Sequence, residues 1–416
     1  MNILFITISW PIKGSYNLYS DLMLEFVEHG HSVYAASISG NSLYNTCLSV
    51  ENGVNVLRVS SGSVQRNNKY IKVINSFMAG IKIRHAVVKY FHNISLDLII
   101  FTTPPITMIL DIIRLKHYFK APLYLLLKDI WPQDTVDIGG MRKGSIVWSV
   151  FRWLEKKTYK VSDYIGCMSP ASKKYILKEN TYIDKKKVEV CPNSQKDRFI
   201  TANQKVTLRS KYGIPEESVL FIYGGNIGIA QGIDFLFDIA REVKKDRKKY
   251  LMIVGGGTEF ERLDEGLSKI AANNVSLLPT VDKYEYDMLV SASDVGLILL
   301  HPNAEVPNFP SRLLSYIHAG KPVISAVDEA TDIGDITEYY GCGRCCRNGD
   351  IDEFVKAMEH FMDRKNRIKA GENARKLFMN CYTTEKGYNI IIKHFEKEKN
   401  EVEENEYAFT CEGAKN

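Results

Sequence analysis

The sequence predicts an α/β protein built from two Rossmann-like domains, and three observations carry this prediction. Its 416 residues exceed what one compact core usually holds, which suggests two domains of about 200 residues each. Short apolar runs alternate with amphipathic segments along both halves, a pattern typical of a parallel sheet covered by helices on both faces. Turns that contain Gly, Asn or Pro separate these elements.

The first half carries this alternation from the first residues onward. Its apolar runs predict strands at 2–8, 32–37, 54–59, 97–102, 122–127, 163–168 and 187–191. Its amphipathic segments predict helices at 17–29, 72–92, 106–118, 144–160 and 170–178. The turn-like Pro192-Asn193-Ser194 then ends a first domain that we expect to span 1–195.

The second half repeats the rhythm and predicts a second domain at 196–380. Its strands are expected at 219–223, 250–254, 275–278, 294–299 and 321–325, and its helices at 232–245, 258–271, 283–291, 310–319 and 351–362. A last helix within 381–400 is expected to pack back on the first domain, and the polar, acidic stretch 401–416 to be disordered. Two such domains place chemistry in the cleft between them, at the carboxyl ends of their strands.

Composition and charge narrow the class of protein. A hydrophobic share of 45% and a charged share of 25% are typical of soluble globular chains, and the first residues predict a strand rather than a signal peptide. Eight cysteines without regular spacing favour a reducing cytoplasm. Residues 1–195 hold 24 Lys and Arg against 14 Asp and Glu, and no acid lies between Glu51 and Asp97. This positive half attracts phosphates of a lipid or a substrate; nucleic acid is not expected, because the basic residues follow no known binding motif.

The stretch "GGNIGIAQG" (224–232) directly follows the apolar run 219–223. Closely spaced glycines let backbone N–H groups face an anion, and a helix expected near Ile233 would add its positive end. The spacing matches neither of the two familiar phosphate-binding loops. Glycines that serve packing alone explain the stretch equally well.

A second candidate is the helix expected at 310–319. Pro310 suits its first turn and Gly320 lies just past its end. Ser311 and Arg312 then fall in the first turn, where free N–H groups and a guanidinium would converge on a diphosphate. Because a helix start disfavours a cation, the position of Arg312 indicates an anionic ligand.

The candidate metal sites have simpler explanations. Asp350-Ile351-Asp352 matches a metal-binding D-x-D pattern, but Asp350 suits the N-cap of the helix that follows. Cys342, Cys345 and Cys346 lack a fourth zinc ligand nearby. We therefore expect neither a metal nor another cofactor.

Five segments, in order, resemble the family 4 glycosyltransferases of GT-B architecture, in which two Rossmann-like domains face each other across a cleft. They are "MNILFIT…LMLEFVEHGHSVYAAS", "LLLKDIWPQDTVDIGGM", "CMSPASKKYI…VEVCPNS", "GGNIGIAQGIDFLF" and "PSRLLSYIHAGKPVI". The likeness runs from residue 1 to about 395 and is greatest to the bacterial O-antigen and capsule branch that includes the N-acetylfucosaminyl (L-fucosamine) transferases. Each segment is a weak signal alone, and their order makes the resemblance specific.

The resemblance implies a retaining transfer from a nucleotide diphosphate sugar, with UDP as the expected nucleotide and an N-acetylated deoxyaminosugar suggested by kinship. The donor would lie against the second domain, and a saccharide linked to polyprenyl diphosphate against the first. By position, the donor-binding residues are Gly14, Gly225, Asn226, Gly228, Gln231, Pro310, Ser311 and Arg312. For Gly14, a loop glycine without a donor contact is an equal alternative.

Several positions depart from the family pattern. Asn226 and Gln231 stand where many members carry an arginine and a lysine, which leaves Arg312 to neutralise the diphosphate. Ser315 replaces the glutamate that holds the ribose, and Glu305 is the nearest acid that could substitute for it. Pro307 occupies the position of that glutamate's usual partner acid.

On the acceptor side, Lys128 and Asp129 end an apolar strand and are the candidate catalytic residues. Asp129 could orient the acceptor hydroxyl or help to deprotonate it; capping of the turn before Trp131-Pro132 is the alternative. His29 and His31 flank a helix-to-strand turn of the family pattern, so we expect structural roles for both.

Two basic amphipathic segments, 69–92 and 144–160, contain aromatic residues and suit an anionic bilayer surface, although each could instead be a core-facing helix with a solvated back. We expect a cytoplasmic protein held peripherally on the inner face of the bacterial plasma membrane. Two other functions stay open: an epimerase that resembles UDP-N-acetylhexosamine 2-epimerase, and a catalytically inactive partner subunit.

Overall fold

The computed structural model describes residues 1–39, 45–60, 69–198 and 208–396, apart from the side chains of 69–73. The chain divides into two compact units. Unit 1 comprises Met1–Lys196 together with the segment that begins at Thr384, and unit 2 comprises Asp197–Thr383. The stretch 401–416, expected to be disordered, lies outside the described residues.

Unit 1 is built on an eight-stranded sheet in the order β3-β4-β2-β1-β5-β6-β7-β8. All neighbouring strands are parallel except the β3–β4 pair. The strands are β1 (Asn2–Ile6), β2 (Ser32–Ser39), β3 (Cys47–Glu51), β4 (Val54–Ser60), β5 (Leu98–Thr103), β6 (Leu123–Leu127), β7 (Tyr164–Cys167) and β8 (Val188–Val190). Only β3 was not predicted, because this edge strand has no buried residue and therefore no apolar pattern.

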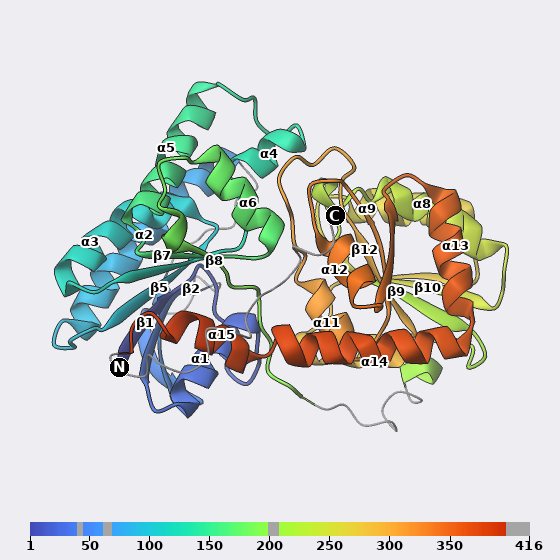
Figure 1. Ribbon diagram of the computed structural model, residues 1–416, viewed down its shortest axis with the longest axis horizontal. Helices are drawn as coiled ribbons and strands as arrows, with labels where there is room; N and C mark the ends of the chain where they lie inside the picture. The colour runs from blue at the N-terminus through green and yellow to red at the C-terminus, as the bar shows by residue number, and fades with distance from the viewer. Residues whose placement is uncertain (40–44, 61–68, 199–207, 397–416) are drawn as a thin grey trace. The chain divides into compact units, whose positions relative to one another are not determined.

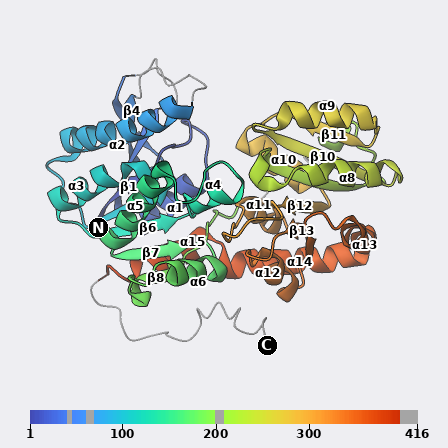
Figure 2. The same ribbon diagram turned by 90° about the horizontal axis from the view of Figure 1, so that it is seen from above.

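Helices cover both faces of this sheet (Figures 1 and 2). Neighbours α2 and α3 pack together, as do α3 and α5, while α1 packs against α15. The helices are α1 (Leu18–Glu28), α2 (Lys69–Phe91), α3 (Ile109–Phe119), α4 (Gln133–Asp137), α5 (Ile146–Val161), α6 (Pro170–Glu179) and α15 (Thr384–Ile392), with short 3-10 turns η1 (Ile106–Met108) and η2 (Lys185–Lys187).

The last described helix, α15, belongs to unit 1 although it follows unit 2 in the chain. The Tyr388 ring stacks on His29 with centroids 4.0 Å apart, and its hydroxyl lies 2.9 Å from His31 Nε2. Both histidines therefore help to hold α15 against the turn between α1 and β2, as expected of structural residues.

Unit 2 contains a six-stranded, fully parallel sheet in the order β11-β10-β9-β12-β13-β14. Its strands are β9 (Val219–Asn226), β10 (Lys249–Gly256), β11 (Val275–Leu278), β12 (Val295–Leu299), β13 (Val323–Val327) and β14 (Gly343–Arg347). Its helices are α8 (Asp234–Lys244), α9 (Phe260–Ile270), α10 (Lys283–Ala292), α11 (Arg312–His318), α12 (Ile333–Tyr339), α13 (Ile351–Met362) and α14 (Arg364–Cys381), with η3 (Ile229–Gln231).

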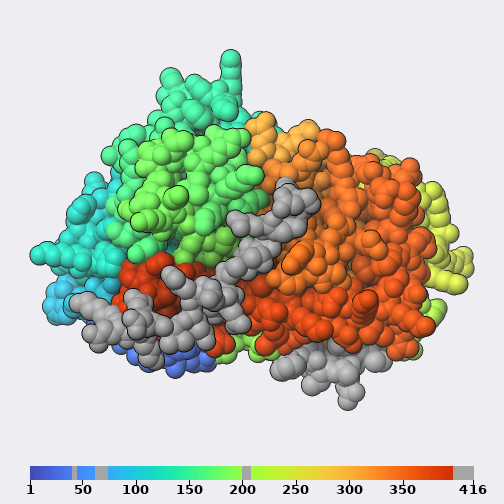
Figure 3. All heavy atoms as spheres, in the orientation of Figure 1, coloured from blue at the N-terminus to red at the C-terminus, as the bar shows by residue number. Residues whose placement is uncertain are grey.

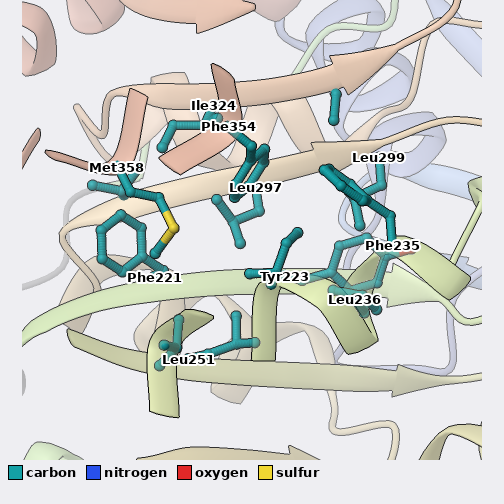
Figure 4. Packing of buried hydrophobic residues seen from close by; sticks show 14 of the residues in the cluster. Phe221, Tyr223, Phe235, Leu236, Leu251, Leu297, Leu299, Ile324, Phe354 and Met358 are labelled. Atoms are coloured by element: carbon teal, nitrogen blue, oxygen red, sulfur yellow. The ribbon is translucent and has the colours of Figure 1, made fainter. Parts of the chain in front are cut away.

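The core of unit 2 forms where α8 and α13 pack on the sheet (Figure 4). Large apolar side chains from these helices pack against those of the four central strands. This packing holds the carboxyl ends of the strands in place. The labelled members of this cluster are Phe221, Tyr223, Phe235, Leu236, Leu251, Leu297, Leu299, Ile324, Phe354 and Met358.

The two Rossmann-like α/β units confirm the predicted fold class. Asp350 is the N-cap of α13, because its Oδ1 accepts a hydrogen bond from the backbone N–H of Glu353 at 3.1 Å. Among the helices of the described residues, none combines the length and the apolar character needed to cross a bilayer.

Candidate functional site

The carboxyl ends of β9 and β10 lie side by side and are lined by backbone rather than by side chains. Gly255 pairs with Gly225 and Gly256 with Asn226 in the parallel register. A Cβ atom built on Gly255 would lie 1.8 Å from the carbonyl oxygen of Gly225, so only glycine permits this approach. Strand β9 continues to Asn226, which means that Gly224 and Gly225 belong to the strand and not to the turn expected there.

Arg312 lies against this strand end. A Cβ atom on Gly225, whose φ is +122°, would lie only 3.4 Å from Arg312 Nη2. The guanidinium also sits over the Tyr223 ring, 4.5 Å from its centroid. The glycine strand end and Arg312 therefore face each other, as the sequence interpretation required.

Arg312 is half-buried, and no acid is paired with its guanidinium in the described residues. Its Nη1 is solvent-inaccessible and has no hydrogen-bond partner, and no ion pair of Arg312 occurs in the described part of the chain. Tyr316, one turn further along the helix, is not a counter-charge, since burial raises the pKa of its hydroxyl to about 12 against the opposing effect of Arg312. A guanidinium without an acidic partner is costly to desolvate, and a diphosphate on the accessible side of this half-buried residue would offset that cost.

The end of β9 and the turn that follows it form a small polar cluster. Asn226 Nδ2 donates to Gln231 Oε1 at 3.0 Å, and Tyr223 Oη donates to the carbonyl of Asn226 at 2.9 Å. A Cβ atom on Gly228 would meet Asn226 Nδ2 at 2.9 Å and Gln231 Oε1 at 3.3 Å. Gly225, Asn226, Gly228 and Gln231 are thus brought together beside Arg312.

Helix α11 is short and holds Arg312 through its buried face. It begins at Arg312 with Ser311 as N-cap, and the Ser311 side chain makes no capping bond; Pro310 precedes it. Tyr316 Oη accepts a hydrogen bond from the N–H of Gly224 and lies 3.2 Å from the carbonyl of Ile222. This hydroxyl ties α11 to β9 directly below Arg312.

The candidate ribose contacts occupy different environments. Ser315, one turn after Arg312, is buried with 7% exposure. Glu305 lies in the loop between β12 and α11 and is exposed, whereas Pro307 is buried. Both candidates belong to unit 2, as does Arg312.

In unit 1, Lys128 and Asp129 directly follow β6. Burial lowers the pKa of Lys128 to about 8, an effect that Cys191 and Asp129 partly oppose. Asp129 is exposed, yet the surrounding protein limits its hydration and raises the pKa of its carboxyl, while Lys128 acts in the other direction.

Two further titratable groups, both on helices, interact with Asp129 at the end of β6. Burial and the charge of Asp129 raise the pKa of Asp134, in α4, to about 7, although bonds from Thr135 oppose the rise. The same two causes raise the pKa of Tyr19, in α1, to about 12. Asp129 therefore interacts electrostatically with an acid and a phenol.

Gly14 lies in the loop between β1 and α1 of unit 1, with a φ of +87° and open space around its Cα. A side chain would strain this backbone even though nothing obstructs it. Gly14 belongs to unit 1, whereas the other donor-site candidates belong to unit 2.

Sequence reasoning missed the second glycine strand end and the tyrosines beneath Arg312. The run Gly255-Gly256-Gly257 follows an apolar strand, which is the same signal that identified 224–232, and could have been found in the same way. No pattern links Tyr223, Tyr316 and Arg312, because they come from separate elements and meet only in the fold. Asp134 and Tyr19 were missed for the same reason.

Comparison with protein families identifies the class of domain in unit 2. Residues 204–377 match the model described as "Glycosyl transferases group 1". This range contains every donor-site candidate of unit 2, from Gly225 to Ser315. This part of the second unit is therefore similar to the group 1 glycosyl transferases, and the match supports a transferase enzyme.

Two curated relatives are named as glycosyltransferases. WbjE of Pseudomonas aeruginosa is 21% identical over 258 residues, which cover 61% of this chain and 63% of the relative. WcaI of Escherichia coli K12, named for colanic acid biosynthesis, is 23% identical over 149 residues and 36% of each chain. The match thus spans less than two thirds of either relative, and the chain is similar to bacterial glycosyltransferases at this level.

Solved structures share the fold over nearly the whole chain. Sucrose-phosphate synthase of Thermosynechococcus elongatus has a TM-score of 0.75, is 14% identical and matches 95% of this chain and 98% of its own. Anabaena HepE in complex with UDP-glucose has a TM-score of 0.70, is 15% identical and matches 95% of this chain and 99% of its own. These neighbours confirm the GT-B fold.

Proposed function

We propose that this protein transfers a sugar from a nucleoside diphosphate sugar, with UDP as the nucleotide, to a saccharide acceptor. The observation that carries the proposal is the half-buried Arg312 guanidinium, which has no acidic partner in the described chain and whose Nη2 lies against the Gly225 backbone. A diphosphate there would supply the missing acceptor atoms. HepE, which shares the fold, is described in complex with UDP-glucose, and this supports the donor class.

The donor would be held mainly by backbone and by neutral groups. The glycine ends of β9 and β10 leave room for phosphate oxygens to approach N–H groups, and Asn226 and Gln231 offer amides to the sugar or the diphosphate. Ser315 or Glu305 would contact the ribose in place of the family glutamate. Gly14 would let the backbone of unit 1 approach the donor phosphate.

The chemistry we propose proceeds with retention at the anomeric carbon. The acceptor oxygen forms a bond to that carbon on the face from which the diphosphate leaves, and the departing phosphate oxygen takes the acceptor's proton. Asp129 would accept a hydrogen bond from the acceptor hydroxyl and orient it, with the ammonium of Lys128 beside it. Because Arg312 supplies the positive charge, this proposal requires no metal, so activity should survive treatment with a chelator.

The acceptor we propose is a saccharide carried on polyprenyl diphosphate at the inner face of the bacterial plasma membrane, used in O-antigen, capsule or exopolysaccharide synthesis. The naming of WcaI for colanic acid biosynthesis supports this polymer class. An N-acetylated deoxyaminosugar donor rests on the sequence resemblance alone. The protein would thus work in the cytoplasm, attached to an anionic membrane surface.

A panel of nucleotide sugars tests the proposal. Thermal-shift screening of the full chain should show stabilisation by one UDP-sugar, and incubation of that donor with lipid-linked saccharides should yield a product whose anomeric configuration, read by NMR, matches the donor. An epimerised donor formed without acceptor would identify an epimerase instead. Neither binding nor turnover with any nucleotide sugar would contradict the proposal and favour an inactive partner subunit.

A further inference from the structure

Helix α5 in unit 1 presents an apolar stripe to solvent. Its buried side packs into unit 1 through Phe151, Leu154, Thr158 and Tyr159. On the opposite side, four large apolar residues are exposed, with exposed fractions of 85% for Ile146, 55% for Val147, 47% for Val150 and 48% for Trp153. Ile146, Val150 and Trp153 are spaced by four and three residues and therefore share one helix face.

Cations border this stripe at both ends. Arg142 and Lys143 precede the helix, and Lys156, Lys157 and Lys160 follow Trp153, all of them exposed. Lys157 lies over the Trp153 ring at 5.6 Å, on the same face as the apolar residues. None of these five cations forms an ion pair within the described residues, and Glu155, the one acid of 138–162, is paired with Arg152.

The basic helix α2 offers a weaker surface than its sequence suggested. Arg84, on that helix, is paired with Asp111, with Nε and Oδ1 2.8 Å apart. Arg58, which belongs to the same acid-free stretch, is paired with Glu51 at 2.8 Å. Part of the charge expected to face a membrane is therefore used inside unit 1, whereas the cations around α5 remain available.

We propose that the stripe Ile146, Val147, Val150 and Trp153, with its bordering cations, is a docking surface that inserts into an anionic lipid bilayer. The start of α5 projects from the body of unit 1, as the teal segment of Figure 3 shows, so a flat surface can reach it. Apolar side chains of this kind enter the acyl boundary while lysines and arginines meet lipid phosphates. The charge border favours an anionic bilayer over an apolar protein partner. The inference names the surface that serves the membrane partner proposed above, and its test does not depend on transfer activity.

Vesicle sedimentation of the full chain tests the docking surface. The protein should bind vesicles of phosphatidylcholine with phosphatidylglycerol, bind vesicles of phosphatidylcholine alone much less, and be released by salt. The double variant Ile146→Ser/Val150→Ser should have an affinity for the anionic vesicles that is lower by about tenfold or more. Ile368→Ser, an equally apolar change at a 52% exposed position of α14, is the control and should leave binding unchanged.

A matched pair of charge variants separates this surface from overall charge. Lys157→Glu and Lys89→Glu change the net charge equally, and each removes a lysine that lies over a neighbouring ring, at 5.6 Å from Trp153 and 5.7 Å from Tyr90. Lys157→Glu should weaken binding severalfold and Lys89→Glu should have little effect. Equal losses would mean that docking depends on total charge or on α2, and would overturn the proposal.

Insertion itself can be read from Trp153. Lipids brominated in their acyl chains should quench tryptophan fluorescence on vesicle binding, and Trp153→Phe should remove most of that quenching. Undiminished quenching in Trp153→Phe, or equal binding to neutral and anionic vesicles, would contradict the proposed mode. A dimer in sedimentation analysis that Ile146→Ser/Val150→Ser dissociates would instead assign the stripe to contact between copies. An absence of vesicle binding by the unaltered chain would overturn the proposal. Intact UDP binding in all these variants would keep the outcome separate from that of the proposed transferase function.

Discussion

The two units share a Rossmann-like topology but equip their strand ends differently. In unit 2 the ends of β9 and β10 carry glycines, and the charge comes from the half-buried Arg312. In unit 1 the end of β6 carries Lys128 and Asp129, and Asp134 with a pKa raised to about 7 lies in the nearby α4. A guanidinium stays charged at all physiological pH values, whereas the unit 1 groups titrate. Donor binding should therefore respond little to pH, and turnover should respond strongly.

Substitution of a glycine at the strand ends of unit 2 is expected to have the largest effect on stability and on UDP binding. Gly255→Ala places a Cβ atom where the Gly225 carbonyl oxygen lies, so the two strand ends must separate. We expect the free energy of unfolding of unit 2 to fall by about 2–4 kcal/mol, with loss of UDP binding. Chemical denaturation measures the first effect and calorimetry the second.

Gly228→Ala is the matched control for this change. Its Cβ would meet the ends of the flexible Asn226 and Gln231 side chains rather than backbone, so stability should change by less than about 1 kcal/mol. If both variants were equally stable, the close approach of β9 and β10 would not need glycine.

The titratable character of the unit 1 site predicts a kinetic effect. Asp129→Asn should lower kcat by about a hundredfold and leave the affinity for the donor unchanged. Because the charge of Asp129 is one cause of the raised pKa of Asp134, that pKa should fall in the variant. The part of the pH profile that reflects Asp134 should then move to lower pH. Equal losses of turnover and donor affinity would remove Asp129 from the acceptor side.

The link between α11 and β9 predicts a moderate effect. Tyr316→Phe removes the hydroxyl that accepts from Gly224 N–H and lies 3.2 Å from the carbonyls of Ile222 and Leu297. The unfolding free energy should fall by about 1–2 kcal/mol, and UDP should bind severalfold less tightly because Arg312 loses its support. Full stability together with full affinity would show that this bond does not position Arg312.

The smallest expected effect concerns Asp134, and the size of this effect depends on pH. Its pKa is raised from 3.8 to about 7, so the folded state holds a proton that the unfolded state releases. Stability from this group is complete below pH 4 and is lost as the pH rises through 7. Asp134→Asn removes that loss and should stabilise the protein by about 1 kcal/mol at pH 8 and hardly at all near pH 4. Thermal melts at the two pH values give the comparison, and an Asn variant that is less stable at pH 8 would reverse the sign.

The sequence predicted the parts of this molecule whose signals are local. Apolar runs identified β1, β6 and β9, and the glycine stretch at 224–232 led to the strand end that Arg312 faces. The edge strands β3 and β14 were not predicted, because half-exposed strands have no continuous apolar run. Helix α14 escaped because its side chains are mostly polar and its few buried residues give a weak period.

Contacts between distant segments could not be predicted at all. The ring of Tyr223 beneath Arg312 joins β9 to α11, and the hydroxyl of Tyr388 reaches His31 across more than 350 positions. Likewise, the raised pKa of Asp134 follows from burial and from a neighbouring charge, which no sequence window contains. Residue type and local sequence identified the candidate site residues, whereas the surroundings of each residue depend on tertiary packing.

Calorimetric titration of the full chain with UDP, for the unaltered protein and for Arg312→Ala, tests the central claim most directly. The account predicts a loss of binding free energy of about 1.5–3 kcal/mol, the scale of a charge-assisted hydrogen bond. Arg241→Ala, an exposed arginine of α8 paired with Asp238, is the control and should bind UDP as the unaltered protein does. Equal affinity in the protein and in Arg312→Ala would contradict the assignment of this arginine to the donor diphosphate.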